Sequence, residues 1–122
     1  MDLESLKSIG INIEDGLAYC AEDEEFYGEM IEEYIAEKDG RAKELAESFD
    51  QGDWDRYRIA AHSVKSTSRM IGADELSETA REMEQAAKDS NEEMLLTEHA
   101  LFLSEYIKLA EKLSAVLADD QE

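Results

Sequence analysis

The stretch "DWDRYRIAAHSVKSTSRMIGAD", residues 53–74, decides the fold because it contains one complete helix together with both of its ends. Asp53 is a favourable N-cap residue, and Gly72 stands where helices commonly end. Asp74 follows at once and is expected to cap the next helix. The stretch therefore predicts a helix that runs to about Ile71 and is joined by a tight turn to a second helix.

Helical periodicity continues on both sides of this stretch. A long helix is expected to begin after Asp23, a good N-cap, and to continue through Leu45 to Phe49. Its apolar residues lie near one face: Phe26, Met30, Tyr34 and Ile35. After Asp74, a third long helix has apolar residues spaced by four, three and four: Leu76, Ala80, Met83 and Ala87.

The last helix is expected to open on a capping box formed by Ser90 and Glu93. Its apolar stripe consists of Phe102, Tyr106, Leu109, Leu113 and Val116. Four long amphipathic helices joined by short polar turns predict an all-α fold, an antiparallel up-down four-helix bundle with short extra N-terminal helical segments. We expect one domain over residues 1–122, with capping helices in 1–22, the bundle in 23–118 and a frayed tail in 119–122.

The composition agrees with a small helical domain. The chain has 122 residues, no proline and 43 % hydrophobic residues, which suits one helical core. The single cysteine, Cys20, can form no internal disulfide and is expected to be a small core residue. No apolar run approaches the roughly 18 residues of a membrane span, so we expect a soluble, cytoplasmic protein.

The net charge of −20 argues against nucleic acid or an anionic membrane as a partner, because both would repel such a protein. This charge is unevenly distributed. Residues 54–72 contain four basic residues against one acidic residue, a local charge of +3. The least acidic part of the molecule therefore coincides with the helix of residues 53–71, and it is a candidate binding site for a negative group.

His62 lies in the middle of this basic stretch. At about 100° per residue, the core-facing arc of the helix lies between about 140° and 220° from His62. That arc holds Tyr57, Ala60, Val64, Thr67 and Ile71. His62 is therefore expected to point into solvent, among the exposed residues Arg58, Lys65, Ser66 and Arg69, with Ile59 and Met70 as a semi-exposed apolar rim.

A solvent-facing histidine in such surroundings is suited to accept a phosphoryl group. An ordinary imidazole is substantially neutral at cellular pH, so one ring nitrogen has a free lone pair. Neighbouring cations can hold an anion against it, as nucleophilic transfer requires. A metal site is discarded, because no second histidine lies at helical spacing from His62 and Glu98 is adjacent to His99. His99 itself is interpreted as an inert surface residue.

At these residues the chain resembles a known family. "AHSVKSTSRMIGADEL" is similar to the signature of histidine-containing phosphotransfer (HPt) domains, His-x-x-Lys-Gly followed by small residues, a glycine and then a leucine. His62, Lys65, Gly72 and Leu76 match in identity and spacing. Three other segments resemble parts of the family over about a hundred residues in all: "GINIEDGLAYCAEDEEFYGEMIEEYI", "GDWDRYRIAAH" and "LSETAREMEQA".

The resemblance implies a bundle whose second long helix exposes the histidine, and it assigns roles to individual residues. His62 would carry the phosphoryl group and Lys65 would help to neutralise it. Glu84 stands 22 residues after His62, where many members have a Glu or Gln beside the imidazole. Lys88, one turn beyond Glu84, could reach the same phosphate. Glu84 and Lys88 are also spaced for an ordinary i,i+4 ion pair with each other.

One position departs from the family pattern. The glycine that usually follows the lysine is Ser66 here, which either crowds the partner or donates a hydrogen bond to the phosphate. The expected docking surface for a partner comprises Arg58, Ile59, Arg69, Met70 and Gly72.

The sequence thus predicts a phosphocarrier, not an enzyme. His62 would receive phosphate from a receiver domain's aspartate or from a histidine kinase and pass it to a receiver's aspartate. No cofactor is expected on this chain, because the receiver would supply Mg²⁺, and we expect a monomer. Two alternatives remain open: the phosphoacceptor domain of a chemotaxis-type kinase, and an adaptor that binds receivers without being phosphorylated.

Overall fold

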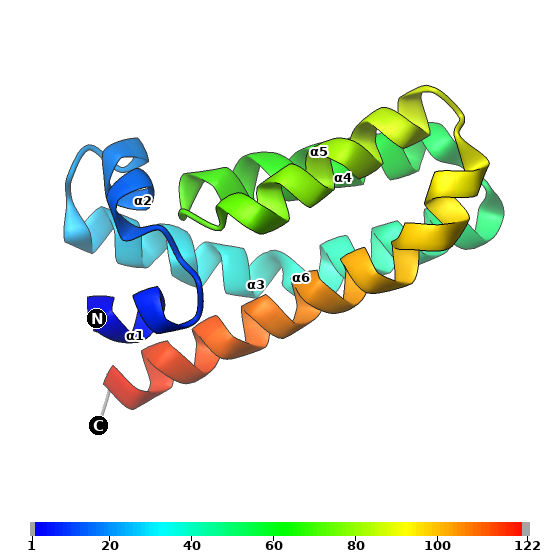
Figure 1. The fold of residues 1–122 in the computed structure, drawn as a ribbon. Helices are drawn as coiled ribbons and strands as arrows, with labels where there is room; N and C mark the ends of the chain where they lie inside the picture. Colours follow the sequence, from blue (N-terminus) through cyan, green and yellow to red (C-terminus); the bar gives the residue numbers. More distant parts are fainter. Residues whose placement is uncertain (1, 121–122) are drawn as a thin grey trace.

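The computed structural model describes residues 2–120, which form six helices and no strands. Two short helices, α1 (Leu3–Ser8) and α2 (Ile13–Tyr19), precede four long ones. The long helices are α3 (Glu24–Gln51), α4 (Trp54–Met70), α5 (Asp74–Lys88) and α6 (Glu92–Asp120). They run up and down in turn, and α3 and α5 each pack against both α4 and α6 (Figure 1). The expected all-α bundle is confirmed.

The start of α3 agrees with the sequence, because the Asp23 carboxylate accepts hydrogen bonds from the backbone N–H groups of Glu25 and Phe26. The helix continues two residues beyond the expected end at Phe49. Its apolar face is rotated from the expected one: Phe26 is 40 % exposed, whereas Tyr27 is fully buried. The Tyr27 hydroxyl donates to the backbone carbonyl of Ile71, 2.7 Å away, which explains why Tyr27 faces inward.

Two of the expected helix caps are wrong. Ala73, not Asp74, is the N-cap of α5, and no side chain caps that helix. The Asp74 carboxylate instead accepts a hydrogen bond from the side-chain amide of Asn12, 3.1 Å away, and so holds the N-terminal segment. At the start of α6, Ser90 has a φ of 54°, and the side chain of Asn91 accepts the bond from the Met94 N–H at 3.2 Å.

The C-terminal helix is longer than expected. α6 continues to Asp120, so residues 119–120 of the expected frayed tail are helical. Residues 121–122 lie outside the described part of the chain. Four of the five expected apolar positions of α6 are buried, namely Phe102, Tyr106, Leu113 and Val116. The four apolar residues expected in α5 are buried as well.

Short N-terminal helices cover one end of the bundle (Figure 1). α1 contacts α6, and α2 contacts α3 and α4. The apolar residues Leu6, Ile11 and Cys20 of this N-terminal segment are buried in the common core, as expected for Cys20. The Asn12 N–H donates to the Gly72 carbonyl at 2.8 Å, which ties this segment to the end of α4.

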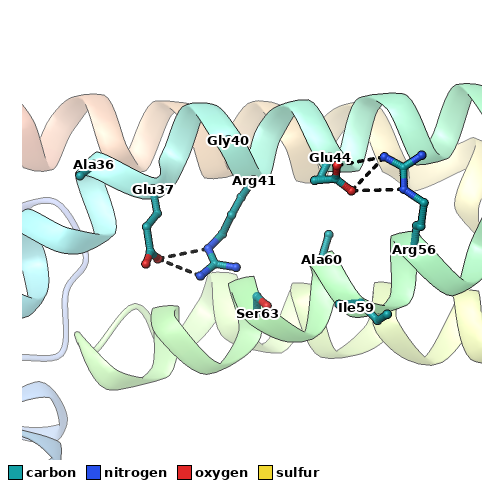
Figure 2. Close-up of a pocket in the computed structure, with 9 residues that line it drawn as sticks. All are labelled: Ala36, Glu37, Gly40, Arg41, Glu44, Arg56, Ile59, Ala60 and Ser63. Carbon is teal, nitrogen blue, oxygen red and sulfur yellow. Dashed lines mark hydrogen bonds and ion pairs between the residues drawn. The ribbon is translucent and has the colours of Figure 1, made fainter.

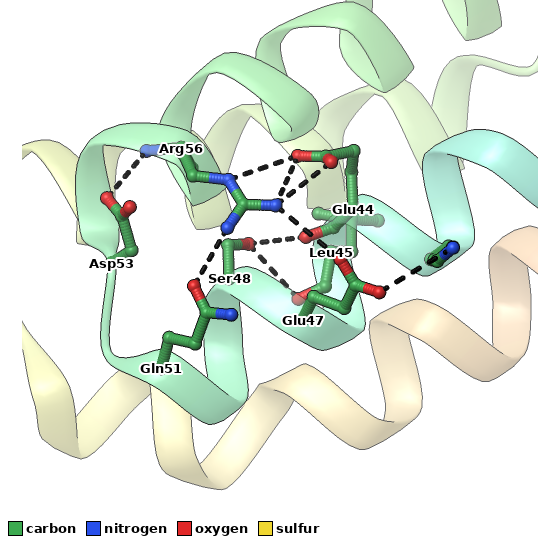
Figure 3. Close-up of polar contacts among 8 residues, drawn as sticks. Glu44, Leu45, Glu47, Ser48, Gln51, Asp53 and Arg56 are labelled. Atoms are coloured by element: carbon green, nitrogen blue, oxygen red, sulfur yellow. Dashed lines mark hydrogen bonds and ion pairs between the residues drawn. The ribbon is translucent and has the colours of Figure 1, made fainter.

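Arg56 links the C-terminal part of α3 to the beginning of α4 (Figure 3). Its guanidinium donates to the Glu44 carboxylate at 2.9 Å and to the Gln51 side chain at 2.8 Å. Its backbone N–H is bonded to the capping carboxylate of Asp53 at 3.2 Å. Partly exposed ion pairs contribute little individually. Several bonds to one side chain nevertheless fix where α4 begins relative to α3.

His99 contradicts the sequence interpretation, because it is a buried residue with only 8 % exposure. Its ring stacks on Phe49, with ring centroids 3.9 Å apart and planes inclined by 6°. The Tyr57 hydroxyl lies 2.9 Å from its Nδ1 in a buried hydrogen bond. His99 occupies a core position of α6, four residues after Leu95 and three before Phe102. This helical spacing from two apolar residues indicates a buried position for His99.

Acidification should destabilise the fold through His99. Burial lowers the pKa of this imidazole, and the charge of Asp50 offsets only part of that effect. The unfolded chain, in which histidine titrates near pH 6.5, therefore binds the proton more readily than the native protein. The contribution of neutral His99 to the free energy of unfolding is fully present above the unfolded-state pKa. It is lost as the pH falls from that value through the lower folded-state pKa.

Urea unfolding at about pH 7.5 and about pH 5.5 measures this effect. The wild type should lose more stability between the two conditions than His99→Gln, in which the group no longer titrates. His62 is present in both proteins and cancels in the comparison. Equal losses would show that His99 does not contribute to the pH dependence.

Within residues 2–120, no helix combines the length and apolar character needed to cross a membrane.

Candidate functional site

His62 lies on the exposed side of α4, as the helical wheel predicts. Its side chain is 56 % exposed, and the opposite face of the helix is buried through Tyr57, Val64 and Ile71. The helical wheel placed Thr67 on the core-facing side, but Thr67 is half-buried, and Ser68 next to it is fully buried. The Ser68 hydroxyl shares a buried 2.8 Å hydrogen bond with the Tyr34 hydroxyl, which accounts for its inward position.

Glu84 on α5 reaches across to His62. Its Oε1 lies 2.8 Å from the imidazole Nδ1, and its Oε2 lies 2.8 Å from the Lys65 Nζ. The Lys65 contact is an ion pair. The side chains of Lys65 and Glu84 are 26 % and 19 % exposed, so solvent screens this pair only in part. One carboxylate therefore links the histidine to the lysine.

The close approach of α4 and α5 places these three side chains together. Ala61 on α4 and Ala80 on α5 are both fully buried, and such small side chains let two helices pack closely. The Ser77 hydroxyl of α5 donates to the backbone carbonyl of Lys65 at 2.9 Å. This bond fixes the register of the two helices beside the site.

The charge of Glu84 determines which nitrogen of His62 is free. Burial raises the pKa of Glu84, but the contacts with Lys65 and His62 outweigh it and hold this pKa below its usual value. The group is therefore a carboxylate near neutral pH, which can only accept a hydrogen bond. In the neutral ring Nδ1 must then carry the proton, so the lone pair resides on Nε2, the nitrogen that Glu84 does not contact.

Lys88 lies one helical turn after Glu84, and Ser66 lies one helical turn after His62. Both side chains are exposed. Among residues 2–120, Glu84 pairs with His62 and Lys65, and no ion pair joins it to Lys88. The i,i+4 pair that the spacing allows is thus not formed, and the Lys88 ammonium remains available to an anion.

The expected docking residues separate into two groups. Ile59 and Arg69 are exposed, and Arg58 and Met70 are half-buried around them. Gly72 was expected to belong to this docking surface, but it is buried and does not lie on the surface. Its φ is +86°, and a Cβ atom there would lie 2.1 Å from the backbone oxygen of Asn12. The glycine is therefore required by the contact between α4 and the N-terminal segment.

A groove that the sequence did not predict lies between α3 and α4 (Figure 2). Its volume is about 540 Å³. We call it the α3–α4 groove, and its lining comprises Ala36, Glu37, Gly40, Arg41, Glu44, Arg56, Ile59, Ala60 and Ser63. The groove adjoins His62, because Ser63 is the next residue and Ile59 lies three residues before it.

Metal ligands are not gathered at the site: within residues 2–120, no group of three or more His, Cys, Asp or Glu side chains is placed to hold an ion.

The fold and the site together define a helical bundle whose second long helix presents an oriented, solvent-facing histidine. The family model of the Hpt domain matches residues 29–119, and the chain belongs to this family. Comparisons with curated proteins and with solved structures gave no match. Hpt domains carry out histidine phosphotransfer in phosphorelays, where they interact with receiver domains and kinases, and they are generally not catalytic.

Proposed function

We propose that this protein is a cytoplasmic phosphocarrier in which the Nε2 of His62 is the phosphoryl acceptor. Phosphate would come from the aspartate of a receiver domain or from a histidine kinase and would leave to the aspartate of a receiver. The observation that carries the proposal is the 2.8 Å contact between His62 Nδ1 and the Glu84 carboxylate. This contact leaves the Nε2 lone pair free on a side chain that is 56 % exposed.

The proposed transfer is an in-line displacement at phosphorus. The Nε2 lone pair forms a bond to the phosphorus atom while the bond between phosphorus and the partner's aspartyl oxygen breaks, and the aspartate leaves as a carboxylate. The ring keeps its Nδ1 proton and gains positive charge. Glu84, already bonded to Nδ1, stabilises that charge without moving. The reverse displacement returns the phosphoryl group to a second aspartate.

Cations near His62 would stabilise the transferred group. Lys65 is held beside the imidazole by Glu84 and can turn from that carboxylate to a phosphoryl oxygen. Lys88 would provide a second charge and Ser66 a hydrogen-bond donor, since both are exposed. Mg²⁺ bound to the receiver would supply the remaining neutralisation. The partner would dock on the surface formed by Arg58, Ile59, Arg69 and Met70, the least acidic part of a protein with a net charge of −20.

Phosphorylation by two donors tests this proposal. The protein is incubated with a phosphorylated receiver domain and, separately, with the small donor phosphoramidate. Both should give an acid-labile, alkali-stable phosphate, and mass spectrometry should map it to the peptide that contains His62. Absence of label from both donors would contradict the proposal.

Removing the charge of Glu84 should slow the transfer. In Glu84→Gln, a neutral side chain replaces the carboxylate, so it neither selects the Nδ1–H form nor neutralises the charge that the ring acquires. Charge-assisted hydrogen bonds exceed neutral ones by roughly 1 kcal/mol or more, so we expect transfer from a phosphorylated receiver to slow about tenfold. Stopped-flow or rapid-quench measurement gives the rate.

Glu82→Gln is the matched control, because Glu82 is exposed on the same helix and its loss changes the net charge equally. Its transfer rate should remain close to that of the wild type. If the two variants were equally slow, overall charge and not the contact with His62 would govern the rate.

A further inference from the structure

Ser77 donates a hydrogen bond that joins α5 to α4 beside the candidate site. Its hydroxyl lies 2.9 Å from the backbone carbonyl of Lys65, and the residue is only 3 % exposed. A helical carbonyl has two lone pairs and its own helix uses one, so this bond is additional to those within α4. Movement of α5 along α4 would leave a buried hydroxyl without a partner, and the bond therefore opposes such movement.

The other buried serines do not link these two helices. Ser48 donates to a backbone carbonyl of its own helix, and Ser68 shares its hydrogen bond with a tyrosine of α3. In the described part of the chain, the remaining hydrogen bonds between the α4 and α5 segments lie in their connecting turn or at the contact of Glu84 with the imidazole. Ser77 thus provides the link between α4 and α5 that belongs neither to the turn nor to the site.

The packing around this bond leaves it a large part in setting the register of the two helices. Ala80 lies between Ser77 and Glu84 on α5 and is fully buried, and Ala61 on α4 is fully buried as well. Small side chains let helices approach closely, but they interlock less deeply than large ones. No side chain caps the beginning of α5, so that end adds no further directional contact.

Ser77 and Glu84 hold the same residue of α4 at two points. Ser77 precedes Glu84 by seven residues, which is about two helical turns, so both side chains leave the same side of α5. Ser77 binds the main chain of Lys65, and Glu84 lies 2.8 Å from its Nζ and 2.8 Å from the Nδ1 of His62. A shift of α5 by about 1 Å away from either contact would take it out of hydrogen-bond range.

We propose that Ser77 is a positioning residue for phosphotransfer at His62. Its hydroxyl holds α5 in the register at which the single carboxylate of Glu84 contacts both the imidazole and Lys65. Ser77 makes no hydrogen bond with His62, so its effect passes through Glu84. The expected effect on transfer rests on the proposed function, whereas the expected effect on the imidazole tautomer can be measured without phosphate.

Ser77→Ala tests the proposal by removing the hydroxyl alone. The Lys65 carbonyl keeps its bond within α4, and alanine is a better helix former than serine, so the fold should be retained, as circular dichroism can verify. Nitrogen-15 NMR at about pH 8.5, above the range in which histidines ordinarily titrate, distinguishes the two neutral tautomers. His62 should be protonated at Nδ1 in the wild type and should become a mixture of both tautomers in Ser77→Ala. Its signals are identified by their absence in His62→Gln.

The same variant should slow phosphorylation of His62 by about threefold to tenfold, because a small misplacement of Glu84 weakens its hold on the ring. The slowing should appear with phosphoramidate and with a phosphorylated receiver domain alike, since the change lies in the nucleophile and not in docking. Ser48→Ala is the matched control, because it removes another fully buried hydroxyl far along α3. It should change neither the tautomer nor either rate.

A double variant separates positioning from a general effect on the fold. Glu84→Ala leaves no carboxylate to be positioned, so the addition of Ser77→Ala to it should slow transfer by no more than about twofold. A purely structural role of Ser77 would slow transfer equally with and without Glu84.

Three outcomes would overturn the proposal while the role of His62 would stand. They are a wild-type tautomer and rate in Ser77→Ala, equal slowing in Ser77→Ala and Ser48→Ala, and additive slowing in the double variant. Failure of the wild type to accept phosphate from either donor would instead contradict the proposed function. A changed tautomer in Ser77→Ala would even then support the positioning of Glu84 by Ser77.

Discussion

His62→Gln should accept no phosphate from a phosphorylated receiver or from phosphoramidate. Glutamine retains a polar side chain of similar reach, but its amide nitrogen has no lone pair available for attack on phosphorus. The fold should be unaffected, because the side chain is 56 % exposed and substitutions at such sites usually change stability by less than about 0.5 kcal/mol. Labelling followed on a gel under alkaline conditions, with circular dichroism of the same samples, measures both quantities.

His99→Gln is the control for the other histidine of the chain. His99 is 8 % exposed and its Nδ1 is bonded to Tyr57, so it offers no nucleophile to a docked partner. Its substitution should preserve labelling at His62. Label that persists in His62→Gln, or that disappears in His99→Gln while the protein remains folded, would contradict the assignment of the acceptor.

The features that the sequence predicted correctly depend on local periodicity. The exposure of His62 follows from the turn angle of a helix and from the apolar residues on the opposite side. The bundle follows from the amphipathic pattern of four long helices, although the apolar face of α3 was placed about one residue away from the observed one. The place of Glu84 beside His62 was implied by the family resemblance, and the contact forms because two antiparallel helices joined by a short turn bring residues equidistant from that turn together.

The features that the sequence did not predict depend on contacts between distant segments. Asp74 looks like a helix cap, but Asn12 is bonded to it across 62 positions of the chain. His99 is polar by type, yet the flat faces of its ring pack against Phe49 as an aromatic residue does. Charge and polarity alone place such a residue on the surface, whereas its spacing from Leu95 and Phe102 places it in the core.

The sequence did not predict the α3–α4 groove for a different reason. It consists of space that two packed helices leave between them, and no residue type marks such a space directly. In the sequence, Gly40 is a glycine in the interior of a long helix, where it only weakens the helix. Its position opposite Ala60 and Ser63 converts that local weakness into an opening on the surface, and only the packing of α3 on α4 shows this.

The role of Gly72 follows partly from its place in the sequence and partly from a contact with a distant segment. Its place after the last turn of α4 marks it as a helix-ending glycine from sequence alone. The contact with Asn12 adds a requirement that sequence does not show, because a Cβ atom would lie 2.1 Å from the Asn12 backbone oxygen. The same two residues share the 2.8 Å hydrogen bond from the Asn12 N–H to the Gly72 carbonyl. A side chain at this position would therefore push the N-terminal segment away from α4.

Gly72→Ala should lower the free energy of unfolding by about 3–5 kcal/mol. A non-glycine residue at positive φ costs about 1–3 kcal/mol, and displacement of Asn12 loses a hydrogen bond worth about 1 kcal/mol together with its packing. Gly10→Ala isolates the contact from the backbone strain, because Gly10 has a φ of +94° and a Cβ atom there would meet nothing within 4 Å. That control should lose only about 1–3 kcal/mol. Urea unfolding of both variants gives the difference, and hydrogen exchange should show faster exchange of the Asn12 amide in Gly72→Ala alone. If Gly72→Ala were no less stable than Gly10→Ala, the contact with Asn12 would contribute nothing, and the end of α4 would be fixed by its own turn.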